Sequence, residues 1–304
     1  MIKFFTKPRR WAMVFSLLLT FAFSYVLLDT FVIPQSLTTV ETKSAVASTA
    51  AATSQSQTDA TVSKNSYEDE NIQINIETVR KYDTTFYVAD IQLTDASYLQ
   101  TALADNTYGR NLKETTSDTA EANDAIFAIN GDYYGFRDSG YVLRNGTVYR
   151  DTARSSGTNE DLVIDKNGDF SIISEDETSL DSLDTDEIWQ ILSFGPALIK
   201  DGEIAVDSSS EVSQSRNSNP RTAIGQISAL HYVVIVSDGR TSESEGLSLL
   251  ELAREFEERG CTTAYNLDGG GSSTMYFNGN IINNPTDGRS SGERKVSDIV
   301  YIGY

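Results

Sequence analysis

The sequence predicts an α+β fold with a mixed, strand-rich sheet core and a few packed helices, preceded by a single transmembrane helix. Three observations support this expectation. Apolar and polar residues alternate along several short segments, as they do in half-buried strands. Asn-Gly pairs interrupt some of these segments, where hairpin turns are favoured. One long apolar run follows a basic N-terminus, and only a few other stretches have helical periodicity.

The N-terminus has the pattern of a membrane anchor. Four basic residues come first: Lys3, Lys7, Arg9 and Arg10. The apolar run that follows, from Trp11 to Ile33, covers the ~20 residues that a helix needs to cross a bilayer. It is longer than the core of a secretory signal, and no Ala-x-Ala-like stretch directly follows it, which favours an uncleaved signal anchor. Because the basic residues precede the run, the rest of the chain is expected outside the cytoplasm.

Composition divides the chain into three parts. Residues 1–34 contain the cytoplasmic basic head and the anchor. Residues 35–66 are rich in Ser, Thr, Ala and Gln and contain no aromatic residue. Because such a segment cannot bury enough apolar surface to become ordered, a flexible stalk is expected there. Residues 67–304 carry aromatic and β-branched residues throughout and are long enough for one core, so we expect a single extracytoplasmic domain.

The exported domain is expected to consist mostly of strands. Apolar patterns predict strands over residues 72–76, 86–93, 125–129, 191–204, 221–227, 231–236, 264–267 and 296–302. Asn-Gly turns predict hairpins over residues 141–149, 162–172 and 275–282. Helical patterns predict helices over residues 98–104, 116–123 and 247–258. Polar loops are expected over residues 174–186 and 207–219.

Charge and rare residues exclude several kinds of function. The formal net charge of −20 repels nucleic acid and anionic lipid headgroups, so neither is expected as a partner. The one cysteine, Cys261, cannot form an intramolecular disulfide and is expected to be a buried thiol. Exported domains without disulfides are common on Gram-positive bacteria, which is the surface we expect for this one. The one histidine, His231, cannot build a His-rich zinc site, and a core or strand-edge position is favoured over a catalytic one.

No cofactor is required by the sequence. Exported acidic sites often bind Ca²⁺ through carboxylate and carbonyl oxygens, so Ca²⁺ stays open as a ligand. No segment has the spacing of an EF-hand loop.

The first motif that could carry chemistry directly follows the apolar segment 125–129. Asn130 and Asp132 provide an amide and a carboxylate where a strand ends, and Tyr133 provides an aromatic face that can stack on a sugar ring. A plain turn, with Asn and Gly in left-handed conformations, explains the same residues equally well.

The second motif contains three consecutive glycines after a predicted strand. Its residues are Asp268, Gly269, Gly270, Gly271, Ser272 and Ser273. Glycines leave backbone N–H groups free to face an oxyanion or a phosphate, the serines add hydroxyl donors, and the aspartate lies at the rim. The Lys-Ser/Thr ending of a P-loop and the spacing of a dinucleotide fingerprint are both missing. A flexible turn is the alternative, but three glycines cost backbone entropy unless something must approach closely, which favours a functional role.

The third feature is a set of arginines near loop ends: Arg221, Arg240 and Arg294. A guanidinium binds phosphate or carboxylate through two parallel hydrogen bonds, which a lysine cannot reproduce. Each arginine alone is explained by a solvated charge or a surface ion pair. Together they could form the cationic pocket that an acidic protein needs for an anionic substrate.

These motifs resemble, in order along the chain, those of the phosphodiester glycosidase family. The resemblance covers residues 72–304 and rests on AIFAINGDYYG, SFGPALIKDGEI, NPRTAIG, VSDGR, LDGGGSS and ERKVSDIVYIG, of which LDGGGSS is highly specific. The family's mammalian member removes N-acetylglucosamine from a sugar phosphodiester, and bacterial relatives are often labelled exopolysaccharide biosynthesis proteins. One departure is Asp132, which stands where the family commonly has a second glycine.

The resemblance implies cleavage of the bond between a sugar's anomeric carbon and a phosphate oxygen. The expected substrate-binding residues are Arg221, Arg240, Arg294, Gly269, Gly270, Gly271, Ser272 and Ser273 around the phosphate, and Asn130 and Tyr133 around the sugar. The carboxylates expected to serve as base, nucleophile or cation ligand are Asp268, Glu293, Asp132 and Asp238. Asp268 and Glu293 rank first among them.

Two alternatives stay open. The domain could be an ordinary exo-glycosidase, or an enzyme that trims wall polymers with sugar–phosphate linkages such as teichoic acids. It could also be a non-catalytic, membrane-anchored glycan-binding or scaffold protein in exopolysaccharide or capsule assembly, which would bind glycan without turnover. The clustering of carboxylates and arginines favours an enzyme, because a binding module does not need it.

Overall fold

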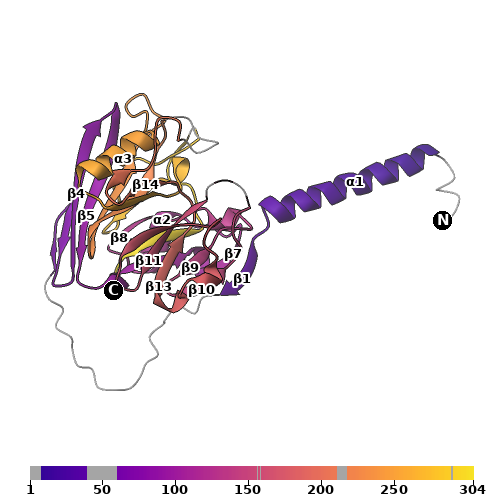
Figure 1. The fold of residues 1–304 in the computed structure, drawn as a ribbon. Coiled ribbons are helices and arrows are strands. Elements are labelled where there is room, and N and C mark those ends of the chain that lie inside the picture. The colour runs from indigo at the N-terminus through magenta and orange to yellow at the C-terminus, as the bar shows by residue number, and fades with distance from the viewer. Residues whose placement is uncertain (1–7, 40–59, 156, 158, 211–217, 289) are drawn as a thin grey trace, which may run out of the picture.

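The computed structural model describes residues 8–39, 60–155, 157, 159–210, 218–288 and 290–304. Helix α1 (Pro8–Phe31) extends away from the folded domain as one long element (Figure 1). It confirms the helix predicted near the N-terminus. Among the described residues it is the one helix long and apolar enough to cross a membrane.

The largest sheet has nine strands in the order β15-β14-β18-β16-β17-β5-β4-β3-β2, and neighbouring strands run antiparallel. The strands are β2 (Thr61–Val62), β3 (Ser66–Glu68), β4 (Ile72–Lys81), β5 (Thr84–Leu93), β14 (Ala197–Lys200), β15 (Glu203–Ile204), β16 (Thr222–Ser228), β17 (His231–Ser237) and β18 (Thr263–Asn266). Helix α3 (Leu249–Glu258) covers one face of this sheet. Its Leu249 and Phe256 are buried in one cluster with Phe86 and Ile235 of the strands.

Two five-stranded sheets pack against the other face. One has the order β20-β19-β8-β23-β6 and contains β6 (Leu99–Leu103), β8 (Phe127–Asn130), β19 (Met275–Phe277), β20 (Asn280–Ile281) and β23 (Asp298–Ile302). The other has the order β10-β9-β13-β11-β12 and contains β9 (Val142–Arg144), β10 (Thr147–Arg150), β11 (Glu160–Asp165), β12 (Phe170–Ser174) and β13 (Ile188–Leu192). Helix α2 (Thr116–Ala122) packs on the first of them through Ala120.

A single large core joins the three sheets. Buried side chains from each of them meet there, among them Ile74 of β4, Phe127 of β8 and Leu162 of β11. Removing apolar surface from water stabilises a fold by about 25 cal/mol per Å², so a cluster of this kind is the main stabilising element of the domain. The strand ends around this core are therefore held rigidly, and the candidate site lies at these ends.

Most elements expected from the sequence are confirmed, including the three hairpins and the helices near residues 116–123 and 247–258. The helix expected over residues 98–104 is wrong, because this segment forms β6 and pairs with β23. Leu99 and Leu103 are buried by that pairing, and tertiary contacts of this kind override a local preference. The loop expected over residues 207–219 is only partly described, since residues 211–217 lie outside the described residues.

The interval expected as a stalk contains strand residues at both of its described ends: β1 at its start, and β2 with the first residue of β3 at its end. Strand β1 (Gln35–Thr39) pairs antiparallel with β7 (Thr107–Arg110), so the chain returns to the domain directly after α1 (Figure 1). The edge of β7 offers backbone N–H and C=O groups that such a strand satisfies. Residues 40–59 lie outside the described residues.

Cys261 and His231 occupy the positions expected for them. Cys261 is a free, buried thiol, and burial raises its pKa to about 12. His231 lies at the start of β17, where its Nε2 is 3.1 Å from the Asp90 carboxylate.

Candidate functional site

Three segments that are distant in the sequence meet where strands β8, β18 and β16 end or begin. Asn130, the last residue of β8, is fully buried and connects them. Its side-chain N–H donates to the carbonyl of Asp268 at 2.7 Å, and its Oδ1 accepts from the hydroxyl of Thr222 at 2.8 Å. The amide expected to orient a sugar is therefore used inside the protein, where it aligns the first motif with the second.

A cavity of 310 Å³ opens beside this junction. Its lining residues are Lys113, Asp132, Tyr133, Phe136, Asp268, Ser272, Asp287, Arg294, Lys295, Val296 and Ser297. Five of the residues expected from the sequence are among them: Asp132, Tyr133, Asp268, Ser272 and Arg294. The spatial convergence expected for the first and second motifs and for Arg294 is therefore present in the structure.

The cavity holds three basic residues as well as the carboxylates of Asp132, Asp268 and Asp287. Lys113, Arg294 and Lys295 all line it. Arg294 is anchored by Asp287, whose Oδ1 accepts from Nη2 at 2.6 Å and from Nε at 2.9 Å, while its side chain stays 42% exposed. Cations gathered in a concave site attract an anionic ligand more strongly than the same charges spread over a surface.

Asp268 provides a carboxylate on the cavity wall. Its Oδ1 accepts the backbone N–H of Gly269 at 2.9 Å. Burial raises the pKa of the Asp268 carboxyl, and the positive charges of Arg294 and Arg137 oppose that shift. A carboxyl with a raised pKa can gain and release a proton nearer to neutral pH than an ordinary aspartate.

Tyr133 provides the aromatic surface. Its ring stacks on that of Phe136 with centroids 4.6 Å apart, and both rings line the cavity. The guanidinium of Arg137 lies 5.4 Å from the Tyr133 ring centroid. A sugar ring placed in this cavity would meet a preformed aromatic face.

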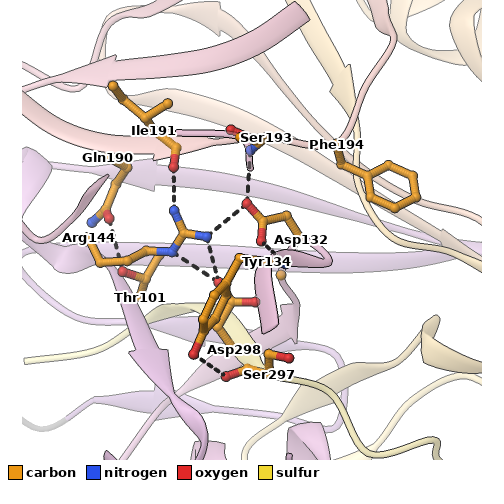
Figure 2. A network of polar contacts seen from close by, with 12 residues as sticks. Thr101, Asp132, Tyr134, Arg144, Gln190, Ile191, Ser193, Phe194, Ser297 and Asp298 are labelled. Atoms are coloured by element: carbon orange, nitrogen blue, oxygen red, sulfur yellow. Dashed lines mark hydrogen bonds and ion pairs between the residues drawn. The ribbon is translucent and has the colours of Figure 1, made fainter. Parts of the chain in front are cut away.

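A buried ion cluster supports the floor of the site (Figure 2). The Arg144 guanidinium is enclosed between two carboxylates, with Nη2 2.8 Å from Asp132 Oδ2 and 2.9 Å from Asp298 Oδ2. Its Nη1 donates to the carbonyl of Ile191. Burial alone would lower the pKa of Arg144, but the two carboxylates raise it, so this arginine is a permanent buried cation.

Asp132 is held by several donors at once. Its Oδ2 accepts from Arg144 and from the backbone N–H of Ser193 at 2.8 Å, and its Oδ1 accepts from the backbone N–H of Tyr134 at 2.9 Å. Asp132 thus binds the first motif to Arg144 of β9 and to the end of β13. These three donors fix the position of the Asp132 carboxylate.

Asp298 carries the other half of the cluster. Burial raises the pKa of Asp298 to about 8; the positive charge of Arg144 opposes the shift, and Asp132 adds to it. Its Oδ1 is buried without a hydrogen-bond partner among the described residues. A Cβ atom on Gly131 would lie 2.4 Å from this oxygen, so glycine is required at that position.

Replacing Asp298 by asparagine is expected to remove a pH dependence of stability. Because the folded-state pKa is raised above the ordinary ~3.9, the folded protein binds the extra proton, and wild-type stability falls as pH rises from about 4 to about 8. Asparagine mimics the protonated acid, with its oxygen facing Arg144. Thermal unfolding at several pH values should show a flatter profile for the variant. A profile parallel to the wild type would contradict this assignment.

The remaining predicted residues lie outside the cavity lining. Arg221 is buried, and its Nε donates to the carbonyl of Leu247 at 2.9 Å. Arg240 donates to Asn219 Oδ1 from Nε at 3.3 Å and from Nη2 at 3.2 Å. Ser273 is fully buried. Together with Asn130, these residues contribute to the scaffold of the junction.

Two of the predicted carboxylates make structural contacts. Glu293 accepts the backbone N–H of Ser117 at 3.1 Å and also its hydroxyl, at the N-terminus of α2, where a negative charge is stabilising. Asp238 accepts the backbone and side-chain N–H groups of Asn284 at 2.7 and 2.9 Å. Neither faces the cavity, whereas Asp268 does.

The glycine run allows arginines to approach the backbone. A Cβ atom on Gly271 would lie 2.6 Å from Asp287 Oδ1 and 2.8 Å from Arg294 Nη2. The backbone N–H of Gly269 is bonded to Asp268, and that of Gly270 donates to the carbonyl of Pro220 at 2.8 Å. The run therefore provides space beside Arg294, while two of its N–H groups are already used.

Arg144, Asp298, Lys113 and Asp287 were not singled out from the sequence. Asp298 stands at the start of an apolar strand, and Arg144 directly precedes an Asn-Gly turn, so each has a simple local explanation. The one sequence signal that could have identified these two residues is a charged side chain directly beside an apolar segment. Within the described residues, no group of three or more His, Cys, Asp or Glu side chains is arranged to hold a metal ion.

Comparisons with known proteins agree with the motif pattern. Residues 123–303 match a family described as phosphodiester glycosidase. The chain is 31% identical over 202 residues to an SPbeta prophage-derived uncharacterized protein of Bacillus subtilis, covering 65% of this chain and 31% of that protein. It is 29% identical over 207 residues to human N-acetylglucosamine-1-phosphodiester alpha-N-acetylglucosaminidase, covering 62% and 40%. It thus spans about a third to two fifths of the length of these relatives.

A solved structure has the same fold. The catalytic domain of the zebrafish N-acetylglucosamine-1-phosphodiester alpha-N-acetylglucosaminidase, described as auto-inhibited by its pro-peptide, superposes with a TM-score of 0.61 at 21% identity. The match covers 78% of this chain and 85% of that one. The predicted α+β, strand-rich sheet core is confirmed by this likeness.

Proposed function

The chain belongs to the phosphodiester glycosidase family, and from this premise we propose that it is an extracytoplasmic hydrolase of sugar-1-phosphodiester linkages in a cell-surface or extracellular glycan. Helix α1 would anchor it in the cell membrane in a single pass, with the domain outside, on a Gram-positive surface. Its partners would be a carbohydrate or sugar-phosphate substrate and the membrane.

The observation that carries the proposal is the presence of Asp268 and three cations in one cavity. Cleavage of a glycosyl phosphate builds positive charge on the anomeric carbon and negative charge on the departing phosphate. Lys113, Arg294 and Lys295 would stabilise the phosphate, and Asp268 would face the sugar. Positive and negative side chains in one cavity can stabilise the opposite charges that develop in the reaction.

The residues suggest a simple sequence of events. The sugar would lie on the Tyr133 ring with its phosphate at Arg294. As the bond from the anomeric carbon to the phosphate oxygen breaks, the bond electrons leave with the phosphate, which is a weak base and requires little acid assistance. A water oxygen would bond to the anomeric carbon and pass its proton to the Asp268 carboxylate. Arg144 and Asp132 would keep the segment that carries Tyr133 and Phe136 in place.

The test compares two substrates with the same sugar. The full-length protein in detergent should hydrolyse a methyl phosphodiester of N-acetylglucosamine 1-phosphate, or of another sugar in a matched panel, at least about 100-fold faster than the neutral p-nitrophenyl glycoside. Faster cleavage of the neutral glycoside would support an ordinary exo-glycosidase instead. Saturable glycan binding without turnover across the panel would support a scaffold and overturn the proposal.

A further inference from the structure

The segment directly after α1 is fitted tightly to the domain. Strand β1 pairs with β7 in a register that places Ser36 opposite Gly109. A Cβ atom on Gly109 would lie 2.1 Å from the carbonyl oxygen of Gln35, so only glycine allows β1 to approach so closely. The contact is therefore specific to this residue.

A second contact holds the end of α1 itself. Asn111, the residue after β7, is buried and donates its side-chain N–H groups to the carbonyls of Thr30 and Ile33 at 3.1 and 3.2 Å. The last carbonyls of a helix have no partner within the helix, so this asparagine satisfies groups at its C-terminal end. It adopts a left-handed conformation, with φ of 57°, which asparagine tolerates well.

The same stretch of chain forms a wall of the cavity. Lys113 lines the cavity and is two residues from Asn111, so their Cα atoms are at most ~7 Å apart. The backbone N–H of Asn111 also donates to the carbonyl of Gly135 at 3.2 Å, between the cavity residues Tyr133 and Phe136. Through these hydrogen bonds, Asn111 links the wall of the cavity to the C-terminal end of α1.

The length of α1 places this end at a membrane surface. Its 24 residues span roughly 36 Å at ~1.5 Å per residue, against ~30 Å for a bilayer core. Three residues, 32–34, separate the end of α1 from β1, and β1 pairs with β7 of the domain. The pairing therefore connects the domain to the helix through a tether of three residues.

Resting on the hydrolase activity proposed above, we propose that the β1–β7 pairing holds the cavity at the outer membrane surface, and that the substrate is a sugar-1-phosphodiester whose second ester is a membrane lipid. The phosphate of such a lipid lies at the headgroup level, where Lys113, Arg294 and Lys295 would meet it. Because a net charge of −20 opposes adsorption to an anionic bilayer, the short tether provides the proximity that surface charge does not.

The experiment uses full-length protein in phosphatidylcholine vesicles. Four substrates carry the same sugar 1-phosphate: a diacylglyceryl ester, a polyprenyl ester, a lipid ester raised on a rigid polyproline spacer of ~60 Å, and a soluble methyl ester. The wild type is expected to hydrolyse at least one direct lipid ester tenfold or more faster than the raised one. The two direct esters distinguish a glycerolipid from an isoprenoid source.

Variants test whether the pairing causes this preference. In Gly109→Ala with Asn111→Gly, the ratio of direct to raised substrate should fall at least fivefold. Because both substrates enter the same cavity, a general loss of turnover in this variant would leave the ratio unchanged. Asn111→Gly alone should lower the ratio in the same direction. Asn278→Gly removes another left-handed asparagine, in the β19–β20 turn, and should keep the wild-type ratio.

The outcomes separate this inference from the function on which it rests. A wild-type ratio near one, or a ratio unchanged in both variants, overturns the inference while leaving the hydrolase intact. Failure of the wild type to hydrolyse any of the four esters, the methyl ester included, would instead remove the proposed function.

Discussion

Replacing Asp268 by asparagine is expected to lower kcat/KM for a sugar-1-phosphodiester by on the order of 10²–10⁴-fold. The amide has the same size, and its oxygen can still accept the Gly269 N–H, but it cannot take a proton from water or oppose positive charge on the sugar. Because burial raises the pKa of Asp268, the acid limb of the wild-type kcat/KM profile should also lie above the ordinary ~3.9 of an aspartate. Initial rates across a pH series measure both effects.

Glu293→Gln is the matched control for this variant. The sequence favours Glu293 as strongly as Asp268 for a catalytic role, but the contacts of Glu293 are with Ser117 at the N-terminus of α2. Its loss of charge should lower stability by about 0.3–1 kcal/mol through the helix dipole and leave kcat/KM within a few-fold of the wild type. Full activity in Asp268→Asn, or equal losses in the two variants, would show that Asp268 does not have the role proposed here.

Arg144→Ala is expected to be the most destabilising of the changes discussed. It leaves the Asp132 carboxylate buried without its counter-ion and Asp298 without its hydrogen-bond donor, and removing one partner from a buried ion pair typically costs about 3–5 kcal/mol. In a domain of this size, each kcal/mol lowers the unfolding temperature by roughly 2–4 °C. Activity should fall as well, because Asp132 would no longer hold Tyr134 and Ser193 in place.

Arg110→Ala is the control for charge removal. Arg110 pairs with Asp138 at 2.9 Å, but their side chains are 32% and 74% exposed. Water screens such a pair, so its loss should cost less than about 1 kcal/mol. Thermal unfolding of both variants at one pH measures this difference in stability. Similar melting temperatures would mean that the buried cluster does not stabilise the domain.

The site residues that the sequence could predict share one property. Asp132, Asp268 and Arg294 each stand in a motif where a strand has just ended or is about to begin. Side chains at such positions leave the packed sheet and face a concavity, and local patterns are enough to locate strand ends. For the same reason, most strands and all three hairpins were predictable from alternation and Asn-Gly turns.

The remaining site residues depend on contacts that no local pattern contains. Arg144 meets Asp132 across 12 positions of chain and Asp298 across 154, so only the assembled sheets reveal the cluster. The predicted positions of Arg221 and Glu293 differ from the observed ones for another reason. Their places near loop ends were visible, but the direction of each side chain is set by Leu247 or by α2, which pack beside them only in the folded domain.

The position of β23 has a consequence for folding. This strand lies between β8 and β6 in its sheet and brings Asp298 to Arg144, which is 154 positions away in the sequence. Contacts between residues so far apart cost chain entropy before they stabilise the fold, so sheets that depend on them form slowly. The buried ion cluster is therefore expected to assemble late in folding, and the floor of the pocket with it.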